Sequence, residues 1–344
     1  MGISVLNGGL YTTVQDMGRT GYQNLGISSS GAMDQRSFHI ANLLLDNPEN
    51  EAVLEFIQTG PKLRFTADTI IAITGGNFEP SLNGKPVPMY TAVYVHKNDI
   101  LKFHSAKTGS CGYLAFLGKL DIPMVMGSRS THVSCKVGGF CGRRLQTGDF
   151  ICFREKKVYL PHFLSRKLKV DDFDNQSETI RVILGPQDDC FTQEGLYNFF
   201  HEEYTVTGCT DRMGYRLKGP EITHLDGADI ISDGIAFGAI QVANDGQPMV
   251  MLADRPTTGG YTKIATVICT DLPKFVQKKA GDRIRFQKID IEQAQMLDQH
   301  VQKEYQTMQK IIHQPCREVL EPRIVAQRIA ELLSKTKQGE SSWT

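Results

Sequence analysis

The sequence has no surplus of charge of either sign, because 38 lysine and arginine residues balance 38 aspartate and glutamate residues. A neutral chain creates no field that draws it to nucleic acid or to an anionic membrane. It also lacks an apolar run long enough to cross a bilayer, and residues 3–6 look like a strand rather than part of a secretory signal. These absences predict a soluble cytoplasmic protein that binds neither nucleic acid nor membrane.

Several chemical signatures are missing as well. The eight cysteines include no C-x-x-C pair and the nine histidines include no H-E-x-x-H pattern, so we predict no metal site. Neither the G-x-x-x-x-G-K-[ST] phosphate loop nor the G-x-S-x-G nucleophile motif occurs. A reaction that uses a nucleotide would therefore need binding machinery from elsewhere.

Short strand-like runs dominate residues 1–157, which we predict to be a first β-rich domain. The runs lie at 52–56, 70–74, 91–95 and 113–117. Turn signals separate them, and Asn83-Gly84 is typical of a tight hairpin. One helix is expected at 34–45, capped by Asp34. Strands at this density favour a barrel or a sandwich.

The chain becomes charged and irregular at 158–179, which we interpret as a linker. A second β-rich domain is predicted at 180–290, with a short helix near 192–200 capped by Thr192. From 291 to 312, apolar residues recur at helical spacing. A further helix opens at Pro322 and runs to 333. Residues 291–344 therefore form a predicted helical tail, whose last ten residues are expected to be disordered.

The most informative stretch lies between two strand-like runs at 250–253 and 264–267. It is nearly all polar or glycine and runs from Asp254 to Lys263. The pattern predicts a strand, a crowded loop and a second strand, although an ordinary polar hairpin would explain it equally well. The loop would gather Thr257, Thr258 and Tyr261 in one small volume. Gly259 and Gly260 would let the backbone come close to a ligand.

Three other polar clusters interrupt strand-like regions. Asp16 and Arg19 could pair with each other or bind an anion, and Glu55 is either a buried functional carboxylate or an outward-facing residue of an amphipathic strand. Asp211 and Arg212 form the third cluster. The planar fork of arginine suits carboxylates and phosphates.

Two more side chains could take part beside the central stretch. Gln241 lies shortly before it in the chain. Lys263 could neutralise an anion, or act as an acid or base if burial lowers its pKa. Asp254 could serve as a base or orient Lys263.

Assembled in order, these clusters resemble a known family. The motifs that carry the resemblance are Y-T-T-V-Q-D at 11–16, G-A-M-D at 31–34, G-P-Q-D at 185–188, D-R-M-G-Y-R-L at 211–217 and T-T-G-G-Y at 257–261. They identify the chain as similar to the KipA-like proteins, also called allophanate hydrolase subunit 2 or the biotin-dependent carboxyltransferase family. Within the family, the pattern is most similar to the branch that forms the C subunit of 5-oxoprolinase. The match spans roughly residues 3–290, and Thr262 stands where the family usually has proline.

The resemblance implies a mainly β fold of two cyclophilin-like β-barrel domains, here followed by the helical tail. It also implies two partners: a KipI-like protein, which is the B subunit of 5-oxoprolinase, and the A subunit of the same enzyme. Such a complex hydrolyses ATP to open 5-oxo-L-proline to L-glutamate, with ATP bound with or by the partners. The isolated chain could also form a homo-oligomer.

Site roles follow as hypotheses from this resemblance. Arg19, Arg212 and Lys263 would bind the substrate carboxylate and the developing phosphate charge. Asp254 or Glu55 would orient or deprotonate water. Gln241 and Tyr261 would form hydrogen bonds with the lactam. The remaining members of the predicted substrate-binding set are Asp16, Asp211, Thr257, Thr258, Gly259 and Gly260.

Two alternatives remain open at this point. In one, the chain is a non-catalytic regulator that binds a KipI-like kinase inhibitor. In the other, it is the carboxyltransferase component of a urea-carboxylase-like enzyme, with biotin on a separate carrier because this chain has no biotin-attachment sequence.

Overall fold

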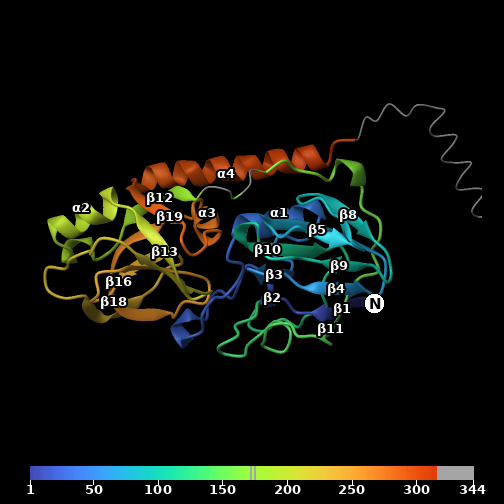
Figure 1. The fold of residues 1–344 in the computed structure, drawn as a ribbon, viewed down its shortest axis with the longest axis horizontal. Helices are drawn as coiled ribbons and strands as arrows, with labels where there is room; N and C mark the ends of the chain where they lie inside the picture. The colour runs from blue at the N-terminus through green and yellow to red at the C-terminus, as the bar shows by residue number, and fades with distance from the viewer. Residues whose placement is uncertain (171–172, 174–175, 316–344) are drawn as a thin grey trace, which may run out of the picture.

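The structure is a computed structural model that describes residues 1–170, 173 and 176–315. It consists of two β-rich halves side by side, with one long helix lying along both (Figure 1). Part of the predicted linker, the predicted helix at 322–333 and the predicted disordered end lie outside the described residues. Within the described residues, no helix is long and apolar enough to cross a membrane.

Two sheets form the first half. The six-stranded sheet has the order β11-β1-β4-β9-β6-β7, and the five-stranded sheet has the order β2-β3-β10-β5-β8. The strands are β1 (Gly2–Asn7), β2 (Tyr11–Gln15), β3 (Val53–Ile57), β4 (Lys62–Phe65), β5 (Thr69–Asn77), β6 (Ser81–Leu82), β7 (Lys85–Pro86), β8 (Ala92–Val95), β9 (Ile100–Lys102), β10 (Thr108–Phe116) and β11 (Phe150–Cys152). Apolar side chains from both sheets share one buried core, in which the rings of Phe65 and Phe116 lie 6.4 Å apart. The predicted hairpin at Asn83-Gly84 is confirmed between β6 and β7.

The second half is a single sheet that closes on itself. Its order is β12-β19-β13-β14-β17-β16-β18-β15, and β12 also pairs with β18. The strands are β12 (Ser177–Leu184), β13 (Tyr204–Thr210), β14 (Gly214–Lys218), β15 (Asp229–Gly234), β16 (Ala239–Val242), β17 (Pro248–Met251), β18 (Thr258–Val267) and β19 (Arg283–Lys288). This closure makes a barrel, in agreement with the mainly β fold predicted from the sequence.

Helices begin where the sequence places capping residues. The α-helices are α1 (Gln35–Leu44), α2 (Gln193–His201), α3 (Leu272–Val276) and α4 (Ile291–Ile312), and short 3-10 turns lie at Gln23–Leu25, Phe163–Ser165 and Asp188–Cys190. Asp34 accepts a hydrogen bond from the amide of Ser37 at 2.9 Å, and Thr192 accepts one from the amide of Gly195 at 2.9 Å. Both predicted caps are confirmed, because each satisfies a backbone donor of the first turn.

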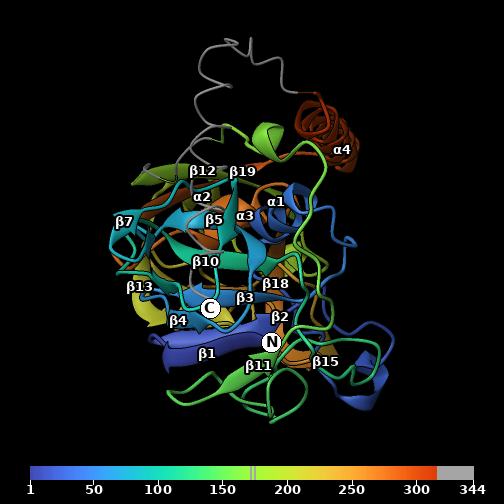
Figure 2. The same cartoon turned by 90° about the vertical axis from the view of Figure 1, so that its right-hand side faces the viewer.

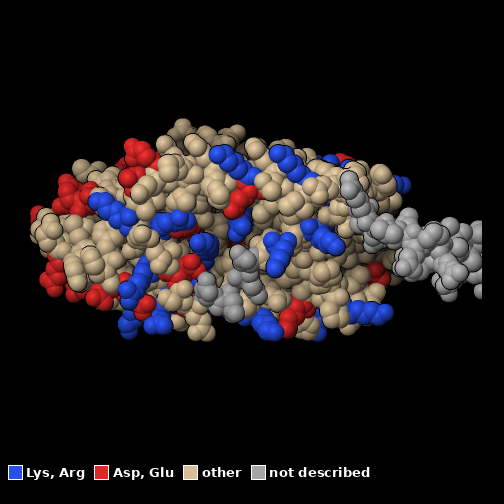
Figure 3. Space-filling model, turned by 90° about the horizontal axis from the view of Figure 1, so that it is seen from above, with Lys and Arg blue, Asp and Glu red and all other residues tan. Residues whose placement is uncertain are grey.

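Helix α4 lies across the two halves on the outside of the molecule, as the two perpendicular views show (Figures 1 and 2). Seen from above, lysine and arginine side chains are spread among uncharged residues, while acidic side chains gather at the end formed by the second half (Figure 3). On this face the basic residues are thus dispersed, whereas the acidic residues are concentrated at one end.

One prediction about the central polar stretch is wrong. The loop was expected to run from Asp254 to Lys263, but β18 already begins at Thr258. Strand pairing with β16 and β15 extends through this part of the stretch, so Tyr261 and Lys263 are strand residues. Tertiary pairing has converted most of the predicted loop into a strand.

Candidate functional site at the junction of the two halves

The predicted residues of β3 and of the second half meet at a buried ionic link. Arg212, which follows β13, donates through Nη1 to Glu55 Oε1, and through Nε and Nη2 to the Asp254 carboxylate at 2.9 and 3.1 Å. Its Nη2 also donates to the carbonyl of Gly31 at 2.7 Å. Glu55 comes from the first half, while Arg212 and Asp254 come from the second. Arg212 therefore joins the halves, and each of its guanidinium nitrogens already has a protein acceptor.

Glu55 is a buried carboxylate rather than an outward-facing one. Besides Arg212, it accepts hydrogen bonds from the amide of Met33 and the hydroxyl of Tyr113, both at 2.8 Å. Burial raises the pKa of Glu55, and the Arg212 charge opposes that effect. The charges of Asp254 and Glu55 outweigh burial at Arg212 and raise its pKa above the ordinary value. The guanidinium thus stays charged.

Asp16 holds a loop in place. It accepts hydrogen bonds from the hydroxyls of Ser128 and Ser130 and from the amide of Arg129, all at 2.6 Å. The amide of Gly18 donates to it at 2.8 Å. The carboxylate is therefore occupied by these donors, and it forms no ion pair with Arg19 among the described residues. This arrangement leaves the arginine free for another anion.

Arg19 is a buried cation with unused donors. Its side chain is almost fully enclosed, with 1% of its surface exposed, and its Nη2 donates to the carbonyl of Ser130. Its Nε and Nη1 have no hydrogen-bond partner among the described residues. Burial lowers the pKa of Arg19, and the charges of Asp16 and Asp254 counter that effect. Unpaired buried donors are rare, and a guanidinium in this state is matched to a carboxylate or phosphate.

Lys263 is a second buried cation with little compensation. Its residue surface is 3% exposed, and its Nζ lies 3.3 Å from a carboxylate oxygen of the exposed Asp233. Beyond this ion pair, Nζ has no hydrogen-bond acceptor among the residues described. Gln241 lies directly across from Lys263 in the pairing of β16 with β18. The lysine therefore offers a positive charge beside an amide side chain.

Gly259 keeps this region narrow. A β-carbon there would lie 2.8 Å from Gln241 Nε2 and 2.7 Å from Ile235 Cδ1, which no side chain tolerates without movement. A β-carbon on Gly260 would meet no atom closer than 3.4 Å. Gly259 is thus packed against the ends of the Ile235 and Gln241 side chains, and its predicted role in the approach of a ligand stays a prediction.

The other predicted residues lie at the edge of this cluster. Asp211 accepts hydrogen bonds from the amides of Met213 and Gly214 and so closes a turn, while Tyr261 is 42% exposed. The carbonyl of Thr257 accepts from the amide of Ile235 at 3.0 Å, and Thr258 is exposed. These contacts leave the side chains of Thr258 and Tyr261 open to a ligand or to another chain.

Arg255 belongs to the cluster although it was not among the predicted site residues. Its Nε donates to the carbonyl of Ile235 at 2.9 Å, and its Nη1 lies 3.4 Å from the hydroxyl of Ser29. Ser28 donates in return to the carbonyl of Arg255 at 2.7 Å. Arg255 stands within the polar stretch of the sequence, but only the fold shows that it meets the serine loop of the first half. This contact brings the Arg19 loop against the Asp254 loop.

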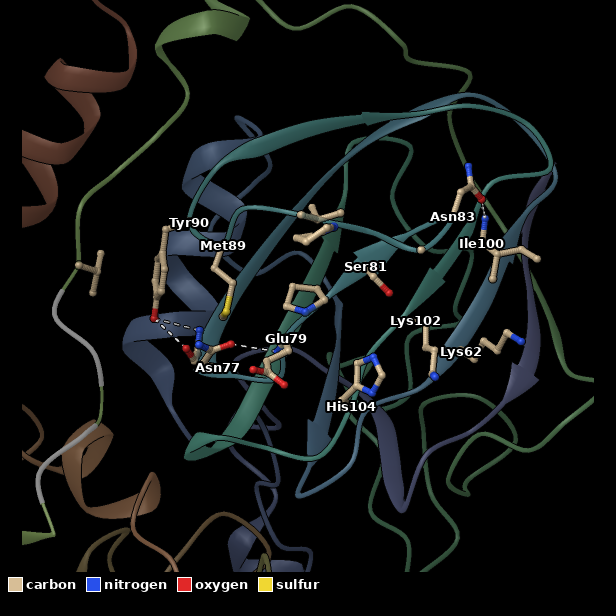
Figure 4. A pocket seen from close by; sticks show the side chains of 16 residues that line it. Lys62, Asn77, Glu79, Ser81, Asn83, Met89, Tyr90, Ile100, Lys102 and His104 are labelled. Atoms are coloured by element: carbon tan, nitrogen blue, oxygen red, sulfur yellow. Dashed lines mark hydrogen bonds between the residues drawn. The ribbon is translucent and has the colours of Figure 1, made fainter.

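A large cavity lies elsewhere, in the first half. It has a volume of about 1010 Å³, and none of the predicted site residues line it (Figure 4). We place the candidate site at the junction because the buried Arg19, with two unpartnered nitrogens, lies within electrostatic reach of Asp254 there, and because Lys263 lies on β18, the strand that follows the Asp254 loop. No group of three histidine, cysteine, aspartate or glutamate side chains suited to a metal ion occurs in the described part of the chain.

Comparison with known proteins places this chain in a family. The model of the carboxyltransferase domain, subdomain A and B, matches residues 25–288. The chain is 34% identical to the C subunit of 5-oxoprolinase from Haemophilus influenzae, over 86% of this chain and 94% of that protein. It is 32% identical to the C subunit of 5-oxoprolinase from Escherichia coli, covering 90% of this chain and 99% of that one.

A solved structure gives the same result. The crystal structure of the K. lactis urea amidolyase matches 89% of this chain with a TM-score of 0.82 and 30% identity. The chain corresponds to only 20% of that much longer protein. The protein therefore belongs to the carboxyltransferase-domain family of subdomains A and B, as its motifs predicted.

Proposed function

We propose that this protein is one component of an ATP-dependent 5-oxoprolinase complex that hydrolyses 5-oxo-L-proline to L-glutamate in the cytoplasm. The observation that carries the proposal is the extent of the similarity. It covers 94% and 99% of two bacterial 5-oxoprolinase C subunits, whereas it covers a fifth of the urea amidolyase. The partners would be the KipI-like B subunit and the A subunit of that enzyme.

The two under-compensated cations fit the charges of this reaction. The substrate carries a carboxylate, and activation of its lactam oxygen by phosphate adds further negative charge. Arg19, whose Nε and Nη1 have no hydrogen-bond partner among the described residues, would donate a hydrogen bond to one of these anions. Lys263 would stabilise the other as a point charge in a site from which water is excluded.

The two carboxylates of the ionic link would then have different roles. The side chain of Asp254 is 11% exposed, whereas that of Glu55 is 0% exposed. Water can reach Asp254, so Asp254 would orient or deprotonate the attacking water. Glu55 would keep Arg212 in place and thereby position Asp254.

ATP binding is assigned to the partner proteins or to a site shared with them. The sequence has no phosphate-binding loop, while the junction offers cations that fit a phosphate group. When bound, ATP would supply the phosphate that turns the lactam oxygen into a leaving group. Whichever of Arg19 and Lys263 does not bind the substrate carboxylate would hold the resulting anionic group in position.

Co-expression with both partners tests the proposal. The purified complex of three proteins should release glutamate from 5-oxoproline only when ATP is present. Replacing Lys263 with alanine should lower turnover by about 100-fold or more and leave the complex assembled, because one charge-stabilising group is lost. Lys288→Ala, at the exposed end of β19, is the matched control and should retain full activity. A stable complex without ATP-dependent glutamate release would refute the proposal.

Carboxyl transfer is the second candidate, favoured by the TM-score of 0.82 with the urea amidolyase. In that case Arg19 and Lys263 would bind the carboxyl group being transferred from biotin on a separate carrier. Incubation with urea and a biotin carrier that a separate biotin carboxylase has charged from ATP and bicarbonate would then produce carboxylated urea. Binding of a KipI-like protein without any turnover in either assay would instead support the regulatory role.

A further inference from the structure

The large cavity of the first half has two chemically different sides. It lies beside the β6–β7 hairpin and the edges of β4 and β9, and its volume of about 1010 Å³ is ample for a small molecule. Figure 4 shows Lys62, Lys102 and His104 along one side, and Tyr90 and Met89 on the opposite side. A ligand that matches this cavity would need an anionic end and an apolar end.

The cationic side of the cavity contains two lysines, Lys62 and Lys102, that lie opposite each other on neighbouring strands. Lys62 and Lys102 are direct partners in the pairing of β4 with β9, a placement that is unfavourable for two ammonium groups. Neither lysine forms an ion pair within the described residues, and both are exposed. The acidic residue that lines the cavity, Glu79, pairs with Lys107 at 3.7 Å. An anion between the two lysines would remove this repulsion.

The remaining walls are held rigidly. The amide of Gly75 donates to the hydroxyl of Tyr90 at 3.0 Å, and that hydroxyl donates to the carbonyl of Gly75 at 3.2 Å. Asn83 accepts from the amide of Ile100 at 2.9 Å. Glu79 and Tyr90 have positive φ, at 45° and 53°, and the surrounding structure fixes them in this rare conformation.

We propose that this cavity is a binding site for a small organic anion, with its phosphate or carboxylate between Lys62 and Lys102 and its apolar body against Met89 and Tyr90. Ser81 lies across from Lys102 in the pairing of β6 with β9 and would donate its hydroxyl to the same head group. The site shares no lining residue with the Arg19 and Lys263 cluster. It is therefore independent of the proposed 5-oxoprolinase role.

Isothermal titration of the full chain with phenyl phosphate, benzoate and inorganic phosphate tests this site. The better of the two aryl anions should bind about tenfold tighter than inorganic phosphate, because its ring buries apolar surface. The preference between phenyl phosphate and benzoate identifies the head group. The double variant Lys62→Gln/Lys102→Gln should weaken aryl-anion binding by about tenfold or more, because both charged donors are lost.

Lys85→Gln is the matched control, since Lys85 lies on β7 of the same hairpin but does not line the cavity. It should leave the affinity unchanged. The melting temperature of the double variant, measured without ligand, should not fall, because the substitution removes a repulsion. Equal affinity in the double variant and the wild type, or no binding of either aryl anion at millimolar concentration, would overturn the proposal.

Discussion

Arg19 and Arg212 are both buried arginines, but they differ in how many of their guanidinium nitrogens have a partner in the protein. Arg212 is matched by two carboxylates and a carbonyl, so its burial is compensated inside the protein. Arg19 has one carbonyl partner and two free nitrogens. A buried donor without an acceptor costs free energy that a bound anion would return. The unpartnered nitrogens of Arg19 therefore make it the candidate for binding a ligand, whereas the fully paired Arg212 has a structural role.

Replacing Arg19 with methionine should therefore separate stability from activity. We expect turnover of the assembled complex to fall by about 100-fold or more, since a preorganised cation is lost. The free energy of unfolding should stay the same or rise, by up to about 1–3 kcal/mol, because a poorly paired buried donor is removed. Chemical denaturation and the glutamate-release assay measure the two effects.

Arg144→Met serves as the control for that experiment because Arg144 is a surface arginine with one bond, to the carbonyl of Leu10. It should change neither quantity. If the Arg19 variant kept full activity, Arg19 would not belong to the site. If the variant lost much of its stability, the role of Arg19 would be structural.

Helix α4 lies beyond the family match, which ends at residue 288. The ring of Tyr305 in α4 lies 4.3 Å from that of His39 in α1. At the far end, His313 lies 2.9 Å from Asp46, which also pairs with Arg166. Only Ile312 of α4 is fully buried. The helix is thus attached through a few side chains at its surface rather than through a deep core.

The His39 contact should make this attachment sensitive to pH. Burial lowers the pKa of His39, although nearby Glu49 opposes the effect. Its ordinary pKa is about 6.5, so the unfolded chain takes up the proton first as the pH falls. The contribution of neutral His39 to the free energy of unfolding should therefore be complete above about pH 6.5 and should fall as the pH drops below that value.

Denaturation of the wild type and of His39→Phe across pH 5 to 8 measures this effect, and the phenylalanine variant should lose this part of the pH dependence. His96→Gln, an exposed histidine substitution, should retain the wild-type pH dependence. If His39→Phe and the wild type followed the same pH curve, His39 would not control the attachment.

On the scale of the whole molecule, the two halves share buried structure. One apolar core contains Tyr113 of the first half together with Tyr215 and Phe275 of the second. Gln277, which follows α3, accepts from the amides of Ser110 and Cys111 at 2.8 and 3.0 Å. Its Nε2 donates to Asp34 and to the carbonyl of Cys111. These contacts make the junction a packed interface, so the halves should unfold together.

Gln277→Ala should weaken this coupling strongly. Each buried group left without a partner costs about 1–3 kcal/mol, and the substitution affects several at once. We expect a lower melting temperature and, if the halves uncouple, two transitions in calorimetry where the wild type shows one. Gln146→Ala, at an exposed turn, is the control and should match the wild type. A single transition at the wild-type temperature in Gln277→Ala would contradict the role of this residue.

Much of the local structure could be predicted from the sequence. The caps at Asp34 and Thr192 and the hairpin at Asn83 rest on interactions within a few residues, and all three are confirmed. The extent of the central loop was predicted incorrectly, because pairing of β18 with distant strands decides where that loop ends. Arg255 was missed for the same reason, since its partners Ser28 and Ser29 lie more than 200 positions away in the chain.

The order of residues along the chain was enough to establish the family, the mainly β character and the set of polar residues from which the site is drawn. These depend on motifs and on periodicity, which need no three-dimensional contact. Only the folded structure shows that Arg212 forms ion pairs with Glu55 and Asp254. It also shows that Arg19 and Lys263 keep side-chain nitrogens without a hydrogen-bond partner among the described residues. The physical reason is that burial and pairing of a charge depend on residues far away in sequence, and those are brought together only when the two halves pack.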